Sequence, residues 1–159
     1  MGLDSYLYLK KYESCCEWDK DVKEKRAHFY PEELKELGER IFENNFMSKE
    51  TLYQVAYWRK ANMIHKYFVD KCTKGVNDCR EVWVPKDVLE DLVKRCREVI
   101  TSPEKAEDIL ATQSGFFFGS TEYNEDYMRD LENTVEMLEP IIAFLKEHKE
   151  YDVVYGASW

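Results

Sequence analysis

The feature that most constrains the fold is a run of apolar residues near the carboxyl end that recur every three or four positions. This spacing places side chains on one face of an α-helix, and a helix with one apolar face buries it against another element. The run predicts a long helix, which we expect Pro140 to kink because proline removes a backbone donor. Its apolar positions are Met128, Leu131, Val135, Leu138, Ile142 and Leu145.

Shorter segments of two kinds precede this helix. The strand-like segments, rich in β-branched and aromatic residues or placed between turn residues, are 5–10, 79–84, 115–119 and 151–155. Further helices are expected to begin near Pro31, Ser48, Pro85 and Ser102, where proline or a capping residue stands before an apolar pattern. The helix from Ser48 is expected to reach about Lys71. The polar stretch from Glu13 to Arg26 indicates neither a helix nor a strand.

Helices that alternate with about four short strands predict an α+β fold. We expect several long helices packed on a small antiparallel or mixed sheet. The chain has 159 residues and contains no internal repeat or flexible linker. We therefore predict a single domain spanning residues 1–159.

The charge and hydropathy of the chain exclude some classes of partner. The formal net charge is −9, which argues against broad nucleic-acid binding because that needs clustered Lys and Arg. No apolar run approaches the length of about 20 residues that spans a bilayer, and the amino terminus does not resemble a signal peptide. We expect a cytoplasmic protein that does not bind membranes.

The cysteines and histidines do not predict a metal site. The five cysteines are odd in number, two of them are adjacent, and they form no C-x-x-C pair. The three histidines lie far apart in the sequence, whereas a structural zinc site needs close pairs of ligands. We expect free thiols and neither a metal nor a cofactor. Cys96 continues an apolar helical pattern and is expected in the core.

The richest concentration of chemically useful side chains lies between residues 54 and 68. If this segment is helical, polar and aromatic side chains form a stripe beside its apolar face, with two cations further round. The alternative is that these side chains pack against neighbouring backbone and have only a structural role. The candidate ligand-binding residues here are Gln54, Trp58, Arg59, Asn62, His65 and Lys66.

A second candidate segment is 112–120, Thr-Gln-Ser-Gly-Phe-Phe-Phe-Gly-Ser. Its glycines allow a ligand to approach the backbone, and Gln113 and Ser114 offer hydrogen-bonding groups beside them. It matches neither a P-loop nor a dinucleotide-binding fingerprint. The alternative, which we favour, is a core strand with a turn at each end.

No catalytic residues are predicted. His65 and Cys72 share a face of the expected helix, but seven residues place them about 10.5 Å apart along its axis, too far for a direct pair. Acidic residues such as Asp130 and Glu132 lie on what looks like a solvated helical face. We therefore lean away from an enzyme.

Four parts of the sequence resemble a family of small uncharacterised proteins encoded by tailed bacteriophages and prophages. These are the start MGLDSYL, the block YWRKANMIHKYFV, the block TQSGFFFG and the final Ser-Trp. Members often have Met where this chain has Ser5 and Trp where it has Tyr67. The resemblance extends nearly from end to end. It implies a phage setting and a shared site at the two central blocks, but it supplies no catalytic residues.

These observations lead to a binding protein as the preferred hypothesis. It is expected to act inside an infected or lysogenic host cell as a counter-defence factor, by sequestering a nucleotide-like small molecule or blocking a host protein. One alternative is a small enzyme acting on a nucleotide or modified base, with His65 as acid–base. Another is a protein-interaction or structural module. The sequence does not define an oligomeric state.

Overall fold

The computed structural model describes residues 2–16, 20, 29–42 and 47–159. The chain divides into two compact units. The larger unit comprises Met1–Leu9 and Tyr53–Trp159, and the smaller unit comprises Lys10–Leu52. The expectation of one domain stays a prediction.

The described residues form an α+β structure, as predicted, with five α-helices and a four-stranded antiparallel sheet. The strands are β1 (Asp4–Cys15), β2 (Met47–Arg59), β3 (Val82–Trp83) and β4 (Tyr151–Ser158). Their order in the sheet is β2-β1-β4-β3, and Val82 and Trp83 pair with Tyr155 and Val154. The predicted strands at 5–10 and 151–155 are therefore present, whereas the one at 79–84 is shorter than expected.

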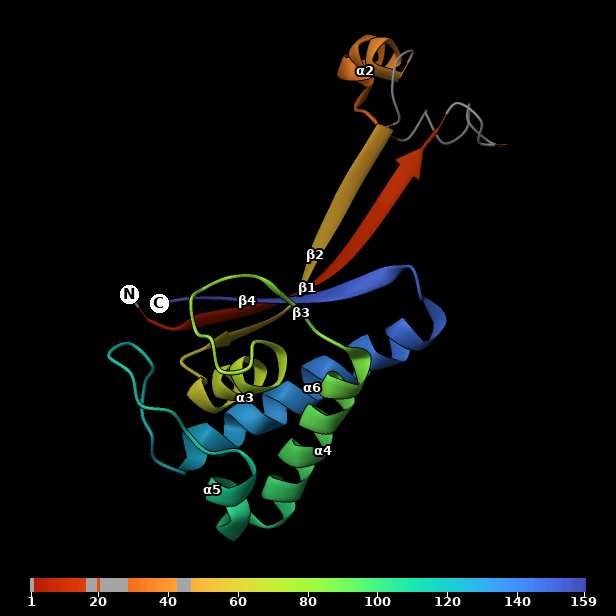
Figure 1. Ribbon diagram of the computed structural model, residues 1–159. Coiled ribbons are helices and arrows are strands. Elements are labelled where there is room, and N and C mark those ends of the chain that lie inside the picture. Colours follow the sequence, from red (N-terminus) through yellow and green to blue (C-terminus); the bar gives the residue numbers. More distant parts are fainter. Residues whose placement is uncertain (1, 17–19, 21–28, 43–46) are drawn as a thin grey trace. The chain divides into compact units, whose positions relative to one another are not determined.

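The larger unit has a helix in each place where the apolar patterns predict one, although α3 is shorter than predicted. They are α3 (Asn62–Cys72), α4 (Lys86–Thr101), α5 (Ala106–Ile109) and α6 (Glu125–Glu147), with a 3-10 turn, η2 (Pro103–Lys105), before α5. Figure 1 shows α3, α4 and α6 gathered on one side of β4. Pro140 lies inside α6, and the helix continues beyond it.

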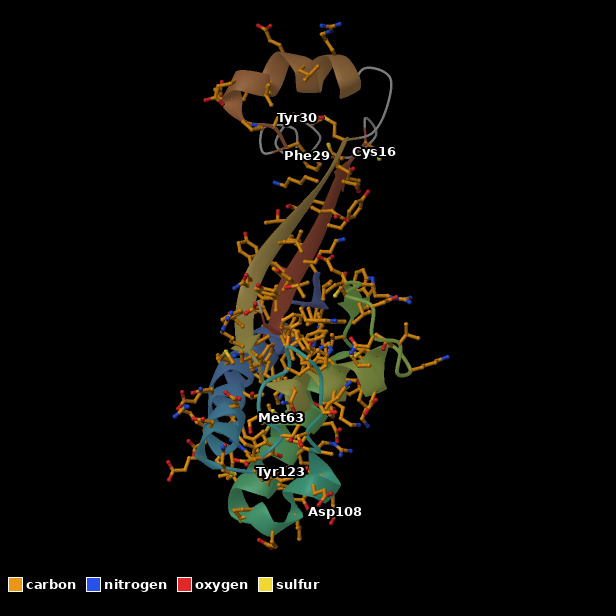
Figure 2. The ribbon with its side chains drawn as sticks, turned by 90° about the vertical axis from the view of Figure 1, so that its left-hand side faces the viewer. Cys16, Phe29, Tyr30, Met63, Asp108 and Tyr123 are labelled. Atoms are coloured by element: carbon orange, nitrogen blue, oxygen red, sulfur yellow. The ribbon has the colours of Figure 1, made fainter. Side chains whose placement is uncertain are left out.

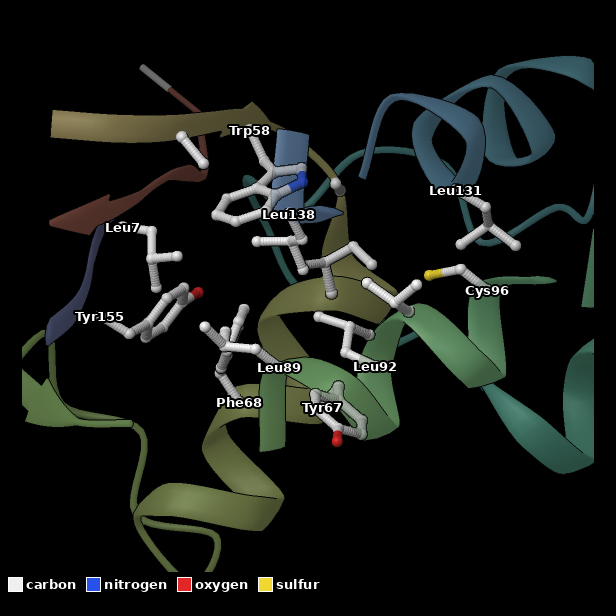
Figure 3. Packing of buried hydrophobic residues seen from close by; sticks show 14 of the residues in the cluster. Leu7, Trp58, Tyr67, Phe68, Leu89, Leu92, Cys96, Leu131, Leu138 and Tyr155 are labelled. Atoms are coloured by element: carbon white, nitrogen blue, oxygen red, sulfur yellow. The ribbon is translucent and has the colours of Figure 1, made fainter. Parts of the chain in front are cut away.

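One continuous apolar core joins these helices to the sheet. Leu89, Leu92 and Cys96 of α4 are fully buried with Leu131 and Leu138 of α6, as Figure 3 shows. Burying each Leu side chain contributes about 1.5–3 kcal/mol. The expectation that Cys96 is a core residue is correct, and burial raises the pKa of its thiol to about 12.

The expected helix from Ser48 to Lys71 is wrong in its first half. Ser48 lies in β2, which continues to Arg59, and only the part from Asn62 onward is helical. Ala56 and Trp58 are buried while Tyr57 and Arg59 are exposed, which is the two-residue alternation of a strand. The aromatic residues Tyr57 and Trp58 and the β-branched Val55 favour a strand, and pairing of β2 with β1 outweighs the helical spacing.

The expected strand at 115–119 is also wrong. The segment is a turn in which the Phe118 backbone N–H donates to the carbonyl of Gly115, and Phe116 is 93% exposed. Gly119 has a φ of 89°, a conformation that strands do not use and that favours glycine. Of the three consecutive phenylalanines, only Phe118 is buried.

The smaller unit has its own small apolar cluster. Cys15 and Met47 are buried in it, and Phe29 and Tyr30 pack against them; Figure 2 shows both aromatic side chains. The helix predicted after Pro31 is present as a 3-10 turn, η1 (Glu32–Leu34), and α2 (Lys35–Phe42). Most of the polar 13–26 stretch falls outside the described residues.

Candidate functional site

The side chains of the predicted stripe do not lie along one helix. Lys60 has a φ of 60° and separates the end of β2 from the start of α3. Gln54, Trp58 and Arg59 lie on the strand side of this junction, and Asn62, His65 and Lys66 lie on the helix side.

Trp58 is part of the core. Its side chain is 3% exposed and its ring lies 6.0 Å from that of Phe68. The indole Nε1–H donates to Oγ1 of Thr134, 2.9 Å away, and this hydroxyl in turn donates to the backbone oxygen of Asp130. The aromatic face is therefore used in packing, and the single polar atom of the ring has a partner.

Asn62 joins the two sequence blocks that we expected to form one site. Its amide nitrogen donates to the carbonyls of Phe118 and Ser120 at 3.1 and 2.8 Å. Its oxygen accepts the backbone N–H of Gln113 at 2.9 Å. The side chain is 1% exposed. Because both ends of the amide are occupied, Asn62 holds the 113–120 segment in place.

His65 is similarly enclosed, with 1% of its surface exposed. Nε2 lies 3.0 Å from Oδ1 of Asn77, which only accepts, so Nε2 carries the hydrogen. Nδ1 therefore accepts from the Tyr155 hydroxyl at 2.7 Å, and that hydroxyl lies 3.0 Å from Oγ of Ser5. Burial lowers the pKa of His65, although the bond to Asn77 opposes the shift. The ring is a neutral link in a buried network.

The remaining predicted residues are more accessible. Arg59 pairs with Asp4 at 3.0 Å, and Lys66 pairs with Asp70 at 2.6 Å. Gln54 and Ser114 are exposed, whereas Gln113 is half-buried. These side chains do not converge on one place.

A cavity of about 250 Å³ adjoins the junction between β2 and α3. We call it the Asp130 cavity. Three segments line it: the β2–α3 junction, the loop at 119–124 and the first turns of α6. Its charged lining residues are Arg59, Lys60, Glu122, Asp126, Arg129 and Asp130. Asn62, Met63 and Tyr127 add to its walls.

Local backbone features shape this cavity. A Cβ atom on Gly119 would lie 2.9 Å from Cβ of Lys60 and 3.2 Å from its carbonyl oxygen, so only glycine allows the loop to approach this closely. At the other end of the loop, Asn124 caps α6 by accepting the backbone N–H groups of Asp126 and Tyr127. The loop is therefore fixed at both ends beside the junction.

The charges around the cavity are unevenly paired. Arg129 forms an ion pair with Asp126, and Arg59 with Asp4. Within the described part of the chain, Lys60 has no ion-pair partner and the carboxyl of Asp130 has no side-chain hydrogen bond. Asp130 is half-buried, and burial raises its pKa to about 6 against the opposing charge of Arg129. This carboxyl is available to a ligand.

Only part of the predicted set borders this cavity. Arg59 and Asn62 line it, but Trp58, His65 and Gln113 do not. His65 instead borders a separate space of about 10 Å³, room for one water at most. The sequence interpretation missed Asp130. The signal that identifies it is helical spacing, because Tyr127 and Thr134, three residues before and four after it, are both buried.

Comparison with protein-family models, curated proteins and solved structures gives no match to this chain. Among the described residues, no helix combines the length and apolar character needed to cross a membrane. Nor do the described His, Cys, Asp and Glu side chains gather in a group of three that would suit a metal ion. The site is therefore interpreted from its own chemistry.

Proposed function

We propose that the protein is a non-enzymatic binding protein that takes a small nucleotide-like ligand in the Asp130 cavity. The observation that carries this proposal is the half-buried carboxyl of Asp130, which has no side-chain partner among the described residues and lies in a cavity that also presents Lys60, Arg59 and Arg129. A ligand with hydrogen-bond donors at one end and negative charge at the other complements this arrangement.

The hydrogen-bonding groups of the cavity favour one class of nucleotide over another. A carboxylate accepts hydrogen bonds only, so it favours a ring edge that presents N–H groups. Guanine presents adjacent imino and amino donors on its pairing edge, whereas adenine presents an amino donor beside an acceptor. The cations provide partners for a phosphate. Ligand cavities commonly measure roughly 300–1,000 Å³, so about 250 Å³ suits a mononucleotide better than a larger molecule.

We further propose, on the resemblance to phage-encoded proteins, that the protein acts in an infected or lysogenic bacterial cell. There, sequestering a nucleotide-like signal would serve counter-defence. Blocking a host protein is the other form of binding that the same setting allows. Both forms need a stable scaffold with accessible polar groups and neither needs a catalytic group.

The enzymatic alternative has one observation in its favour, and it concerns Asp130. A carboxyl with a pKa near 6 in a cavity suits proton transfer close to neutral pH. His65 does not offer this, because both ring nitrogens are occupied and the ring does not border the cavity. Chemical conversion of a bound nucleotide, lost in Asp130→Asn, would favour this alternative over simple binding.

The test is isothermal titration calorimetry of the full chain with GMP, AMP and inorganic phosphate. We expect GMP to bind more tightly than AMP or phosphate, and Asp130→Asn to weaken GMP by about tenfold or more, since hydrogen bonds to charged groups contribute about 1.5–3 kcal/mol. Glu132→Gln is the matched control, because it removes one carboxylate from an exposed position of the same helix. Equal binding by Asp130→Asn and wild type would contradict the proposed site.

A further inference from the structure

The sheet of the larger unit has a second face, opposite the core helices. Along β1, Ser5, Leu7 and Leu9 are buried while Tyr6 and Tyr8 between them are only half-buried. Successive residues of a strand point to opposite faces, so the two tyrosines lie on the side away from the core. Figure 1 shows the helices of this unit on the other side of β4.

Aromatic side chains from three strands occupy this face. The rings of Tyr6 and Tyr8 lie 6.1 Å apart, and those of Tyr6 and Tyr57 lie 5.4 Å apart. On β3, Trp83 pairs with Val154 and is 59% exposed. Val82 beside it packs against the core, so Trp83 points to the opposite face. We call Tyr6, Tyr8, Tyr57 and Trp83 the aromatic sheet face.

A carboxylate adjoins these rings. A Cβ atom on Gly156 would lie 3.6 Å from Cγ of Glu81 and 4.0 Å from the ring of Tyr8, so both side chains lie next to this buried glycine. The pKa of Tyr8 is raised by burial and, to a lesser degree, by Tyr6 and Glu81. Glu81 is exposed and has no ion-pair partner within the described residues.

We propose that the aromatic sheet face binds a basic segment of a partner protein, with an arginine side chain stacked on Tyr8 beside Glu81. A guanidinium is attracted to the face of an aromatic ring and also pairs with a carboxylate. The net charge of −9 attracts such a segment over longer range. Arg59 lines the Asp130 cavity and pairs with Asp4 beside Tyr57, so the two surfaces adjoin there. Tyr8 and Glu81 do not line the cavity, and their proposed role does not depend on the ligand bound there.

The same charges disfavour two other occupants. Single-stranded nucleic acid stacks on aromatic side chains but needs a positive groove for its phosphates. Here Arg59 is already paired with Asp4, and Glu81 has no ion-pair partner among the residues that the structure describes. A second copy of the chain would bring two charges of −9 together. Arginine provides both the planar surface and the opposite charge.

The test uses an eight-residue peptide of alternating Arg and Gly and a second peptide in which citrulline replaces each Arg. Citrulline keeps the planar shape and removes the charge. Binding to the full chain is measured by calorimetry at physiological salt. We expect the Arg peptide to bind at least tenfold more tightly than the citrulline peptide, and the double variant Tyr8→Leu, Glu81→Gln to reduce its affinity at least tenfold.

Two controls separate this surface from general attraction to an acidic protein. Glu132→Gln alone, and the double variant Glu132→Gln, Tyr123→Leu, change the same types of residue elsewhere and are expected to bind like wild type. Thermal melting verifies that every variant folds, and Trp83→Ala provides a second, exposed position at which binding should weaken. Equal affinity of the two peptides, equal loss in the control double variant, or binding of oligothymidylate in place of the peptide would overturn the proposal.

Discussion

Asn62 and His65 at the start of α3 differ from Asp130 of α6 in what their side chains contact. Asn62 and His65 use their side-chain polar atoms within the protein, and each is 1% exposed. Asp130 is half-buried and its carboxyl has no side-chain partner among the described residues. Polar residues concentrated in the sequence can therefore serve to build a site, while the accessible group comes from another segment.

The physical reason is the cost of burying polar groups. A buried amide or imidazole without partners costs about 1–3 kcal/mol, so side chains as deep as Asn62 and His65 are stable only when the protein itself satisfies them. A half-buried carboxyl keeps some contact with water and can remain without a protein partner. Polar side chains that can bind a ligand are therefore expected at the edge of the core, where they are only partly buried.

The largest expected effect that tests this comparison is that of Asn62→Ala. It leaves the carbonyls of Phe118 and Ser120 and the N–H of Gln113 without their partner. We expect the free energy of unfolding to fall by about 3 kcal/mol, measured by urea denaturation. Gln54→Ala, at an exposed position of β2, is the control and should change it by less than about 0.5 kcal/mol. A loss below about 1 kcal/mol for Asn62→Ala would show that this side chain does not hold the segment.

A smaller effect is expected for Gly119→Ala, which tests how the loop is held beside Lys60. The substitution introduces both an unfavourable φ and a contact of 2.9 Å with Cβ of Lys60. Gly75→Ala is a matched control, since Gly75 has a φ of 85° but no atom within 4 Å of the added Cβ. We expect losses of about 2 and about 1 kcal/mol respectively. Equal losses would mean that the close approach to Lys60 contributes nothing.

The smallest effect concerns the charge of Asp130. Its pKa is raised from 3.8 to about 6 in the folded state, so the folded protein binds more protons than the unfolded chain between these values. The contribution of this carboxyl to the free energy of unfolding is therefore complete below about pH 4, and it is lost as the pH rises through 6. At pH 8 we expect Asp130→Asn to be about 1 kcal/mol more stable than wild type. The pKa shift alone would give a larger difference, but solvent screens the charge of this half-buried carboxyl.

Urea denaturation of wild type and Asp130→Asn from pH 4 to pH 8 tests the predicted direction of this pH dependence. The advantage of Asp130→Asn should disappear at the acidic end, whereas Glu132→Gln should differ little from wild type throughout. A constant difference across this range would contradict the raised pKa.

The sequence predicts those parts of the fold in which the apolar residues follow either the helical or the strand spacing and not both. The helices α4 and α6 follow from apolar spacing, and β1 and β4 from alternation and aromatic content. The segment 54–68 satisfies both patterns, because Tyr57, Ala61, Ile64 and Phe68 keep helical spacing across the junction at Lys60. Pairing with β1 decides its first half, and pairing between distant segments is not visible in local spacing.

The site was predictable in part for a similar reason. Contact between the two sequence blocks was expected, and Asn62 provides it through Gln113, Phe118 and Ser120. The importance of Asp130 was not expected. An acidic residue at the edge of an amphipathic helix is taken as solvated unless the segment that covers it is known. Here that cover comes from the junction and loop some 70 and 10 residues earlier in the chain.

The most direct test of the central comparison is a single NMR titration that follows the side-chain carboxyl carbon of Asp130 and the ring of His65 from pH 3 to pH 9. We expect Asp130 to titrate near 6 and His65 to stay neutral to a pH below its ordinary 6.5. Titration of Asp130 near 3.8 together with His65 near 6.5 would contradict the account, because it would place the carboxyl in solvent and the imidazole outside the buried network.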